Sequence, residues 1–207
     1  MGVKALLNVI LQEVKEIPIL YNPSSFFYNL AVLKRHMDKA PGYLVLFKAM
    51  ERIRRNLNRR FFLWLHFMDT HYRYNPPSEF LHELGYSPYN LLYRAHVFSK
   101  MKYGHLNARE RKTLTNLYDG SVRYVDYLIG MLVEYLSKLG ILDKTYLVIT
   151  SDHGEELGEH GGFGHFRPKL YNELIHVPLI IHGPDTGGFT VKKPVSLIDL
   201  PPTILHL

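Results

Sequence analysis

A long amphipathic segment that leads into a short apolar one constrains the fold of this chain more than any other feature. In residues 120–139 apolar side chains recur at offsets of three and four, which predicts a helix with one buried stripe. The stripe consists of Val122, Val125, Leu128, Ile129, Leu132, Val133 and Leu136. Gly140 follows, where a glycine commonly ends a helix. Residues 145–150 (TYLVIT) then indicate a buried strand.

Two more apolar runs have the length and composition of buried strands. They are residues 61–68 (FFLWLHFM) and residues 177–182 (VPLIIH). Helical segments alternating with short apolar strands predict an α/β fold with a parallel or mixed sheet flanked by helices. In such sheets ligands bind beyond the carboxyl ends of the strands.

Composition narrows the class of protein. The chain has 207 residues, of which 46% are hydrophobic, enough for one domain or slightly more. It contains no cysteine, which excludes disulfides, a thiolate metal site and a cysteine nucleophile within it. Its longest apolar runs are too short to span a bilayer, so we expect no membrane span in this chain. We also expect a cytoplasmic location.

Net positive charge bears on the partners. The formal net charge is +6, which favours anionic ligands in general. Many of the basic residues gather in residues 48–60 (KAMERIRRNLNRR), within a helical, basic region that we place at residues 1–60. We interpret this cluster as a solvated helix face rather than a nucleic-acid patch, because no nucleic-acid-binding module accompanies it.

The clearest candidate metal ligands follow the strand at residues 145–150. Asp152 offers a hard oxygen ligand and His153 a nitrogen ligand, and Gly154 gives the backbone freedom to turn there. A lone Asp-His pair is more often a surface turn. For Glu155 and Glu156 we retain the interpretation of a solvated turn.

The next residues make a site more plausible. His160 and His165 alternate with glycines at positions 158, 161, 162 and 164, and such a loop can approach a ligand closely. Imidazoles there can bind a metal or contact an oxyanion. The alternative is a flexible surface loop, and the residues alone favour neither interpretation.

A second polar cluster follows the run at residues 61–68. It contains His66, Asp69 and His71. For His66 we favour a core histidine with satisfied hydrogen bonds over a ligand. For His71 we favour a functional role, because it lies in a loop past a buried strand and can point into a cleft.

Four ordered segments resemble sulfatases of the alkaline-phosphatase superfamily: FFLWLHFMDTHYRYNPP, YDGSVRYVDYLIGMLVEYL, TYLVITSDHGEELGEHGGFGH and LYNELIHVPLIIHGP. The resemblance covers residues 61–207. It implies that this part is a fragment of a sulfatase-like α/β sandwich core, and that residues 1–60 resemble the variable helical region of the family.

The resemblance also implies roles for four residues. Asp152 and His153 match metal ligands, and His71 matches a histidine that contacts the anionic ester substrate. His165 stands where many sulfatases have an anion-binding lysine. The implied cofactor is a divalent metal ion, for which we expect calcium, with manganese, magnesium or zinc as alternatives.

One part of the family pattern is absent. The chain has neither a C/S-x-P-x-R nucleophile motif nor an acidic pair after an N-terminal apolar strand. We therefore expect a sulfuric-ester hydrolase of which this chain carries only part of the active site. The alternatives are a phosphodiester or phosphonate hydrolase, a phosphoglycerol-type transferase, and a non-catalytic binding module. Open sheet edges would also favour self-association.

Overall fold

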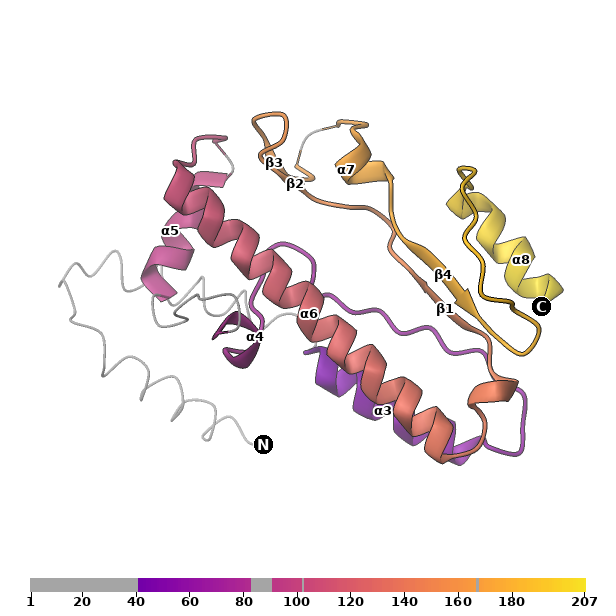
Figure 1. The fold of residues 1–207 in the computed structure, drawn as a ribbon. Helices are drawn as coiled ribbons and strands as arrows, with labels where there is room; N and C mark the ends of the chain where they lie inside the picture. The colour runs from indigo at the N-terminus through magenta and orange to yellow at the C-terminus, as the bar shows by residue number, and fades with distance from the viewer. Residues whose placement is uncertain (1–40, 83–90, 102, 167) are drawn as a thin grey trace, which may run out of the picture. The chain divides into compact units, whose positions relative to one another are not determined.

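The structure, a computed structural model, describes residues 41–82, 91–101, 103–166 and 168–207. The first forty residues of the predicted basic region lie outside the described residues, so their helical character stays a prediction. All described residues belong to one compact unit, His36–Leu207. Its main helices are α3 (Gly42–Arg55), α4 (Glu79–His82), α5 (Leu91–Met101), α6 (Ala108–Lys138), α7 (Asn172–Ile175) and α8 (Leu200–His206) (Figure 1). Its strands are β1 (Leu147–Thr150), β2 (Glu156–Leu157), β3 (Phe163–Gly164) and β4 (Leu179–His182), and two 3-10 turns occupy Leu142–Lys144 and Leu197–Asp199.

Helix α6 begins twelve residues before the predicted start, at Ala108 rather than at residue 120. A capping box starts it: the Asn107 side chain accepts a hydrogen bond from the Glu110 N–H (2.9 Å), and the Glu110 carboxylate accepts one from the Asn107 N–H (2.8 Å). The polar residues of its first turns do not show the apolar stripe on which the sequence prediction depended. The predicted end is confirmed, since Gly140 has a φ of 67° just past the helix.

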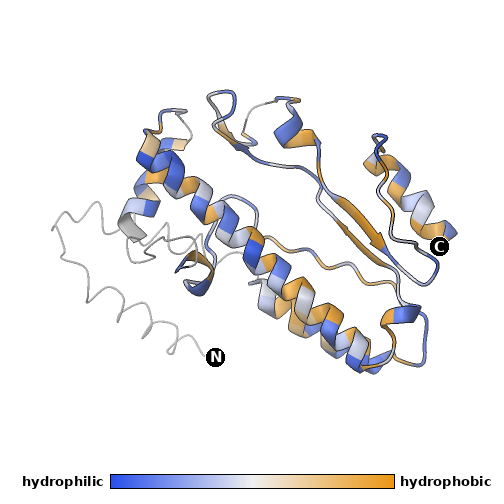
Figure 2. Cartoon of the chain, viewed as in Figure 1, coloured by the Kyte–Doolittle hydropathy of each residue, from blue (hydrophilic) through white to orange (hydrophobic). Residues whose placement is uncertain are grey.

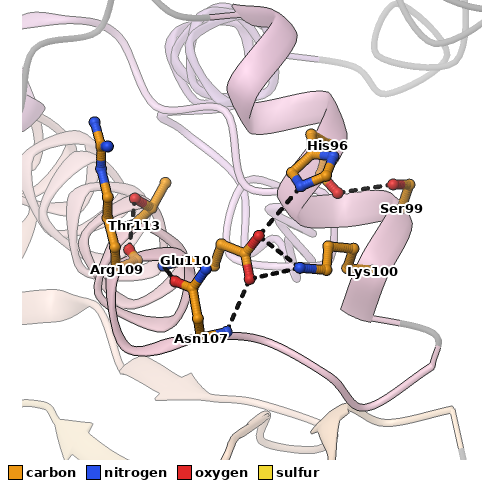
Figure 3. A network of polar contacts seen from close by, with 7 residues as sticks. All are labelled: His96, Ser99, Lys100, Asn107, Arg109, Glu110 and Thr113. Atoms are coloured by element: carbon orange, nitrogen blue, oxygen red, sulfur yellow. Dashed lines mark hydrogen bonds and ion pairs between the residues drawn. The ribbon is translucent and has the colours of Figure 1, made fainter.

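The same Glu110 joins α5 to α6 (Figure 3). Its carboxylate accepts hydrogen bonds from Lys100 Nζ (2.7 and 2.9 Å), and His96 Nε2 lies 3.1 Å from it. The bond from Lys100 and that from the Asn107 N–H hold the pKa of Glu110 below its usual value. One buried carboxylate therefore caps a helix and fixes its neighbour.

Two apolar clusters pack against successive halves of α6. The first half carries Leu114 and Leu117, which are fully buried in a cluster with Tyr74, Leu81, Val97, Phe98, Met101, Leu106 and Phe163. The second half carries Tyr124, Leu128, Leu132 and Leu136, buried with Leu46 and Ile53 of α3. The predicted stripe is therefore correct at Leu128, Leu132 and Leu136. It is wrong at Val122, which is 42% exposed because Ser121 and Tyr124 occupy the buried positions in that turn.

The strands form two small antiparallel ladders in the described part of the chain. β1 pairs with β4 from Leu147 opposite His182 to Thr150 opposite Leu179, and β2 pairs with β3. The expected combination of helices with sheet is confirmed, but the described residues contain no parallel pairing. The reason is the connection: residues 151–178 fold back through the β2–β3 hairpin and α7, so β4 runs opposite to β1.

Residues 61–68 do not form the buried strand that their sequence predicts. Leu63, Leu65 and Phe67 pack against the α3–α6 core, whereas Phe62 is 70% and Trp64 is 75% exposed. Within the described part of the chain, the segment is extended but is not paired with another strand. It is apolar on both faces, and the described chain covers only one of them. Figure 2 shows the hydrophobic colour along it and along β1 and β4.

The exposed side of this segment bears on two expectations. His66 is exposed, so the interpretation as a core histidine is wrong. The uncovered aromatic side chains are those expected of a self-associating surface, and self-association stays a prediction. No helix in the described ranges is both long enough and apolar enough to cross a membrane.

Candidate functional site

Three of the predicted site residues meet at one place. His71 follows the extended segment at residues 61–68, His153 follows β1, and His165 follows β3. The ring centroids of His153 and His165 lie 4.2 Å apart, those of His71 and His165 lie 4.8 Å apart, and those of His71 and His153 lie 5.9 Å apart. One ring nitrogen from each lies within 4.8 Å of those of the other two. We call this group the three-histidine cluster.

Asp152 lies at the edge of this cluster. Its side chain is 75% exposed, and its Oδ1 is 3.9 Å from His153 Nε2. The same carboxylate accepts a hydrogen bond from the His153 N–H (3.1 Å). A carboxylate oxygen and an imidazole nitrogen this close are donors that one divalent cation can share. The pair therefore fits the predicted metal ligands, although their role stays a prediction.

All three rings of the cluster are oriented by their Nδ1 atoms. His71 Nδ1 lies 2.7 Å from the Tyr72 carbonyl oxygen, and His153 Nδ1 lies 2.8 Å from the Gly154 carbonyl oxygen. A carbonyl oxygen only accepts hydrogen bonds, so each Nδ1 carries the hydrogen. His165 Nδ1 makes the equivalent bond to the Glu155 carboxylate (3.1 Å). In the neutral form, each ring therefore keeps its lone pair on Nε2.

Glu155 is the site residue that the sequence did not predict. Its side chain is 4% exposed, so the interpretation as a solvated turn is wrong. It accepts a hydrogen bond from His165 and a longer one (3.4 Å) from the Tyr72 N–H. Burial and the nearby Glu155 charge raise the pKa of Tyr74 and Tyr118. The sequence around Glu155, an Asp-His pair followed by a glycine-rich loop, does not indicate that its side chain is buried.

Comparison with known proteins assigns the family. The family model described as Sulfatase matches residues 20–207, most of the chain. The chain belongs to the sulfatase family. Sulfatases generally use a divalent metal ion, and His71, His153 and His165 form one of the groups in the described residues that could hold such an ion.

Several relatives of this sulfatase-family chain are known. Arylsulfatase K of Danio rerio is 36% identical over 105 residues, which cover 50% of this chain and 20% of that protein. N-acetylglucosamine-6-O-sulfatase of Bacteroides thetaiotaomicron is 42% identical over 90 residues, which cover 42% of this chain and 16% of that protein. A phosphonate monoester hydrolase from Silicibacter pomeroyi matches in structure with a TM-score of 0.46 and 33% identity, covering 53% of this chain and 24% of that one. The chain thus spans about a fifth of the length of the curated relatives it matches.

Gly154 ties the site of this sulfatase-family chain to α7. Its N–H donates to the Leu174 carbonyl oxygen (2.8 Å), and a Cβ on it would lie 2.1 Å from the Glu173 carbonyl oxygen. The φ angle of Gly154 is not positive. The sequence suggested that Gly154 supplies backbone freedom for a sharp turn; in the structure a glycine is required there because the backbone of α7 approaches closely, not because of an unusual dihedral angle.

Glu156 closes the loop behind the cluster. It is 1% exposed and accepts hydrogen bonds from Lys169 Nζ (2.5 Å) and from the Gly162 N–H (2.8 Å). The interpretation as a solvated turn is wrong for this residue also. His160 instead pairs with Glu173 and stacks on Tyr171 (3.7 Å between centroids), apart from the three-histidine cluster.

The Glu156–Lys169 pair predicts a stability that depends on pH. Burial alone would raise the pKa of Glu156, but the bonds from Lys169 and Gly162 outweigh it and hold the pKa below 4.5. The stabilisation is therefore fully present above pH 4.5 and is lost as pH falls through the lower pKa of the folded state. Urea unfolding at several pH values should show this loss. In Glu156→Gln this loss of unfolding free energy at low pH should disappear. If that variant keeps the wild-type dependence on pH, the loss does not come from the Glu156–Lys169 pair.

Proposed function

We propose that the protein is a metal-dependent sulfuric-ester hydrolase in which this chain supplies part of the active site. The observation that carries the proposal is the convergence of His71, His153 and His165, which follow three separate segments of the chain. Family membership supports the reaction class, and the net charge of +6 suits an anionic ester substrate.

Each side chain has a role in this proposal. Asp152 and His153 would hold the divalent cation, which supplies charge neutralisation and polarises the ester oxygens when bound. His71 and His165 contact the sulfate oxygens. Because their Nδ1 hydrogens are bonded elsewhere, these rings donate from Nε2 to an anion when they are protonated. Glu155 holds His165 in place for that contact.

The nucleophile does not come from these 207 residues. They contain no cysteine and no S-x-P-x-R motif. The 207-residue chain alone should therefore show no turnover of aryl sulfates. The gene sequence upstream of Met1 should encode, in frame, a strand with paired aspartates and a C/S-x-P-x-R motif.

The protein encoded by that whole reading frame provides the test. We expect it to hydrolyse an aryl sulfate, and we expect Asp152→Ala to lower kcat/KM at least about a hundredfold, as loss of a catalytic metal does. Asp126→Ala, at an exposed position of α6, is the matched control and should retain wild-type activity.

Three outcomes would contradict the proposal. Robust hydrolysis by the 207-residue chain alone would show that the site is complete within it. Faster hydrolysis of aryl phosphodiesters than of aryl sulfates would assign the phosphodiester or phosphonate reaction. A reading frame without the nucleophile motif, together with no hydrolysis, would favour a non-catalytic binding module.

A further inference from the structure

We propose that residues 48–60 form a binding surface for a sulfated polysaccharide, separate from the three-histidine cluster. The inference rests on the proposed function in one respect, because hydrolysis of sulfuric esters is the reason to expect sulfate rather than another anion. It adds that the substrate is a polymer with many anionic groups, held by a second surface of the chain. We call residues 48–60 the basic surface.

The positive charge of the chain is concentrated on the basic surface. Residues 48–60 contain six cationic side chains and one carboxylate, which give a formal charge of +5, whereas the whole chain has a net charge of +6. The rest of the chain is therefore nearly balanced. Such a distribution attracts polyanions to one part of the molecule rather than to its whole surface. The six cations are Lys48, Arg52, Arg54, Arg55, Arg59 and Arg60.

All six cations are exposed, because α3 buries its opposite face. Leu46 and Ile53 pack in the core beside α6, which leaves the basic side chains in solvent. Glu51 pairs with Lys48 (3.3 Å) and with Arg55 (2.6 Å). Within the ranges that the structure describes, the other four arginines form no ion pair. Their guanidinium groups are therefore available to a ligand.

Helix stability accounts for only part of the basic surface. Arg52, Arg54 and Arg55 lie in the last turn of α3, where cations favour the negative end of the helix dipole. Arg59 and Arg60 lie beyond the end of α3, and the effect of the dipole falls off within the last turn. The dipole therefore gives no reason for these two arginines, whereas an anionic ligand does.

The separation between the basic surface and the three-histidine cluster indicates a polymer. Residues 61–68 lie between Arg60 and His71, and alternate side chains of this extended segment pack on the core. At 3.2–3.4 Å per residue, the segment spans roughly 25 Å. A small ester cannot contact both Arg60 and His71, but a chain of sugar units can.

The residue types on the basic surface favour sulfate groups on such a chain. Five of its six cations are arginines, whose planar guanidinium groups present paired N–H donors to oxyanions. Each exposed contact is weak, but several contacts to one polymer reinforce one another. Residues 48–60 contain no aromatic side chain on which nucleic-acid bases could stack. A sulfated polysaccharide therefore fits this surface better than a single-stranded nucleic acid does.

Binding of heparin to the 207-residue chain tests the proposal. Heparin, a heavily sulfated polysaccharide, should bind, and its affinity should fall as the salt concentration rises. Hyaluronate, an anionic polysaccharide without sulfate groups, should bind at least about tenfold more weakly at the same salt concentration. Duplex DNA should also bind more weakly than heparin does.

Two paired substitutions test the location of the binding surface. Arg52→Gln with Arg54→Gln, and Arg59→Gln with Arg60→Gln, should each weaken heparin binding at least about fivefold. Each pair should also reduce the dependence of the affinity on salt, because fewer counterions are released. Glutamine keeps a helix propensity close to that of arginine, and circular dichroism shows whether each variant is folded. The second pair lies outside α3, so its effect does not depend on the helix.

Lys192→Gln with Lys193→Gln is the matched control. It also removes two exposed positive charges, from a segment that lies far along the chain from the basic surface. This change should alter heparin affinity by less than about twofold. If it weakened binding as much as the arginine pairs do, the ligand would be responding to net charge and the proposal would be overturned.

The protein of the whole reading frame tests the link to the substrate. There Arg59→Gln with Arg60→Gln should raise KM for a sulfated polysaccharide at least about fivefold and leave hydrolysis of an aryl sulfate unchanged.

Three further results would overturn the proposal: arginine variants that bind heparin as the wild type does, hyaluronate binding as tight as that of heparin, or tighter binding of duplex DNA. None of them changes the expected hydrolysis of aryl sulfates, so failure of this inference and failure of the proposed function are distinguishable.

Discussion

Replacing Gly154 with alanine is expected to lower the free energy of unfolding by about 2–4 kcal/mol. The new Cβ would lie 2.1 Å from the Glu173 carbonyl oxygen, and backbone cannot rotate away as a flexible side chain can. Overpacking of this kind costs about 1–3 kcal/mol. Moving the two backbone segments apart also weakens the hydrogen bond from the Gly154 N–H to the Leu174 carbonyl oxygen, which adds about 1 kcal/mol to the loss of stability. Urea unfolding measures the loss.

The matched control is Gly130→Ala. Gly130 lies within α6, and a Cβ there meets nothing within 4 Å. This substitution should raise the free energy of unfolding by about 0.5–1 kcal/mol, because alanine favours helix. A Gly154→Ala protein as stable as the wild type would show that α7 does not lie against this turn.

Leu117→Ala is expected to lower the free energy of unfolding by about 2–5 kcal/mol. Leu117 lies on α6 and is fully buried in the cluster that also contains Val97 and Phe98 of α5 and Tyr74. Removing its side chain loses the transfer free energy of the deleted atoms and leaves a cavity in a close-packed cluster. Chemical denaturation of the purified chain measures this effect.

Leu205→Ala makes the same chemical change at an exposed position. Leu205 is 88% exposed on α8, so its loss should alter stability by no more than about 0.5 kcal/mol. Equal effects of the two substitutions would contradict the assignment of the core beneath the first half of α6.

The most reliable sequence prediction concerned the second half of α6. There the apolar period is uninterrupted and Gly140 ends the helix, so both the element and three of its buried residues followed from the pattern. The first half could not be predicted in that way, because its start depends on a reciprocal bond between Asn107 and Glu110. The wrong prediction at residues 61–68 has a related cause: an apolar composition shows that both faces can be buried, but not that both are covered.

The candidate site was predictable where position alone placed the residue. His71, Asp152 and His153 follow apolar segments, and the structure brings the two histidines together with His165. Glu155 and Glu156 could not be predicted, because a carboxylate in a glycine-rich loop is usually solvated and only the folded loop supplies their buried hydrogen-bond donors. The orientation of each imidazole was likewise invisible in the sequence, since it depends on a carbonyl or carboxylate oxygen.

The uneven exposure of residues 61–68 gives the chain an optical reporter. Trp64 is its single tryptophan and is 75% exposed, so the indole fluorescence of the whole chain comes from this one segment. Its emission should have the red-shifted maximum of an indole in water. Any surface that covers the segment, from another copy or from another polypeptide, would move that maximum to shorter wavelength without a label being introduced.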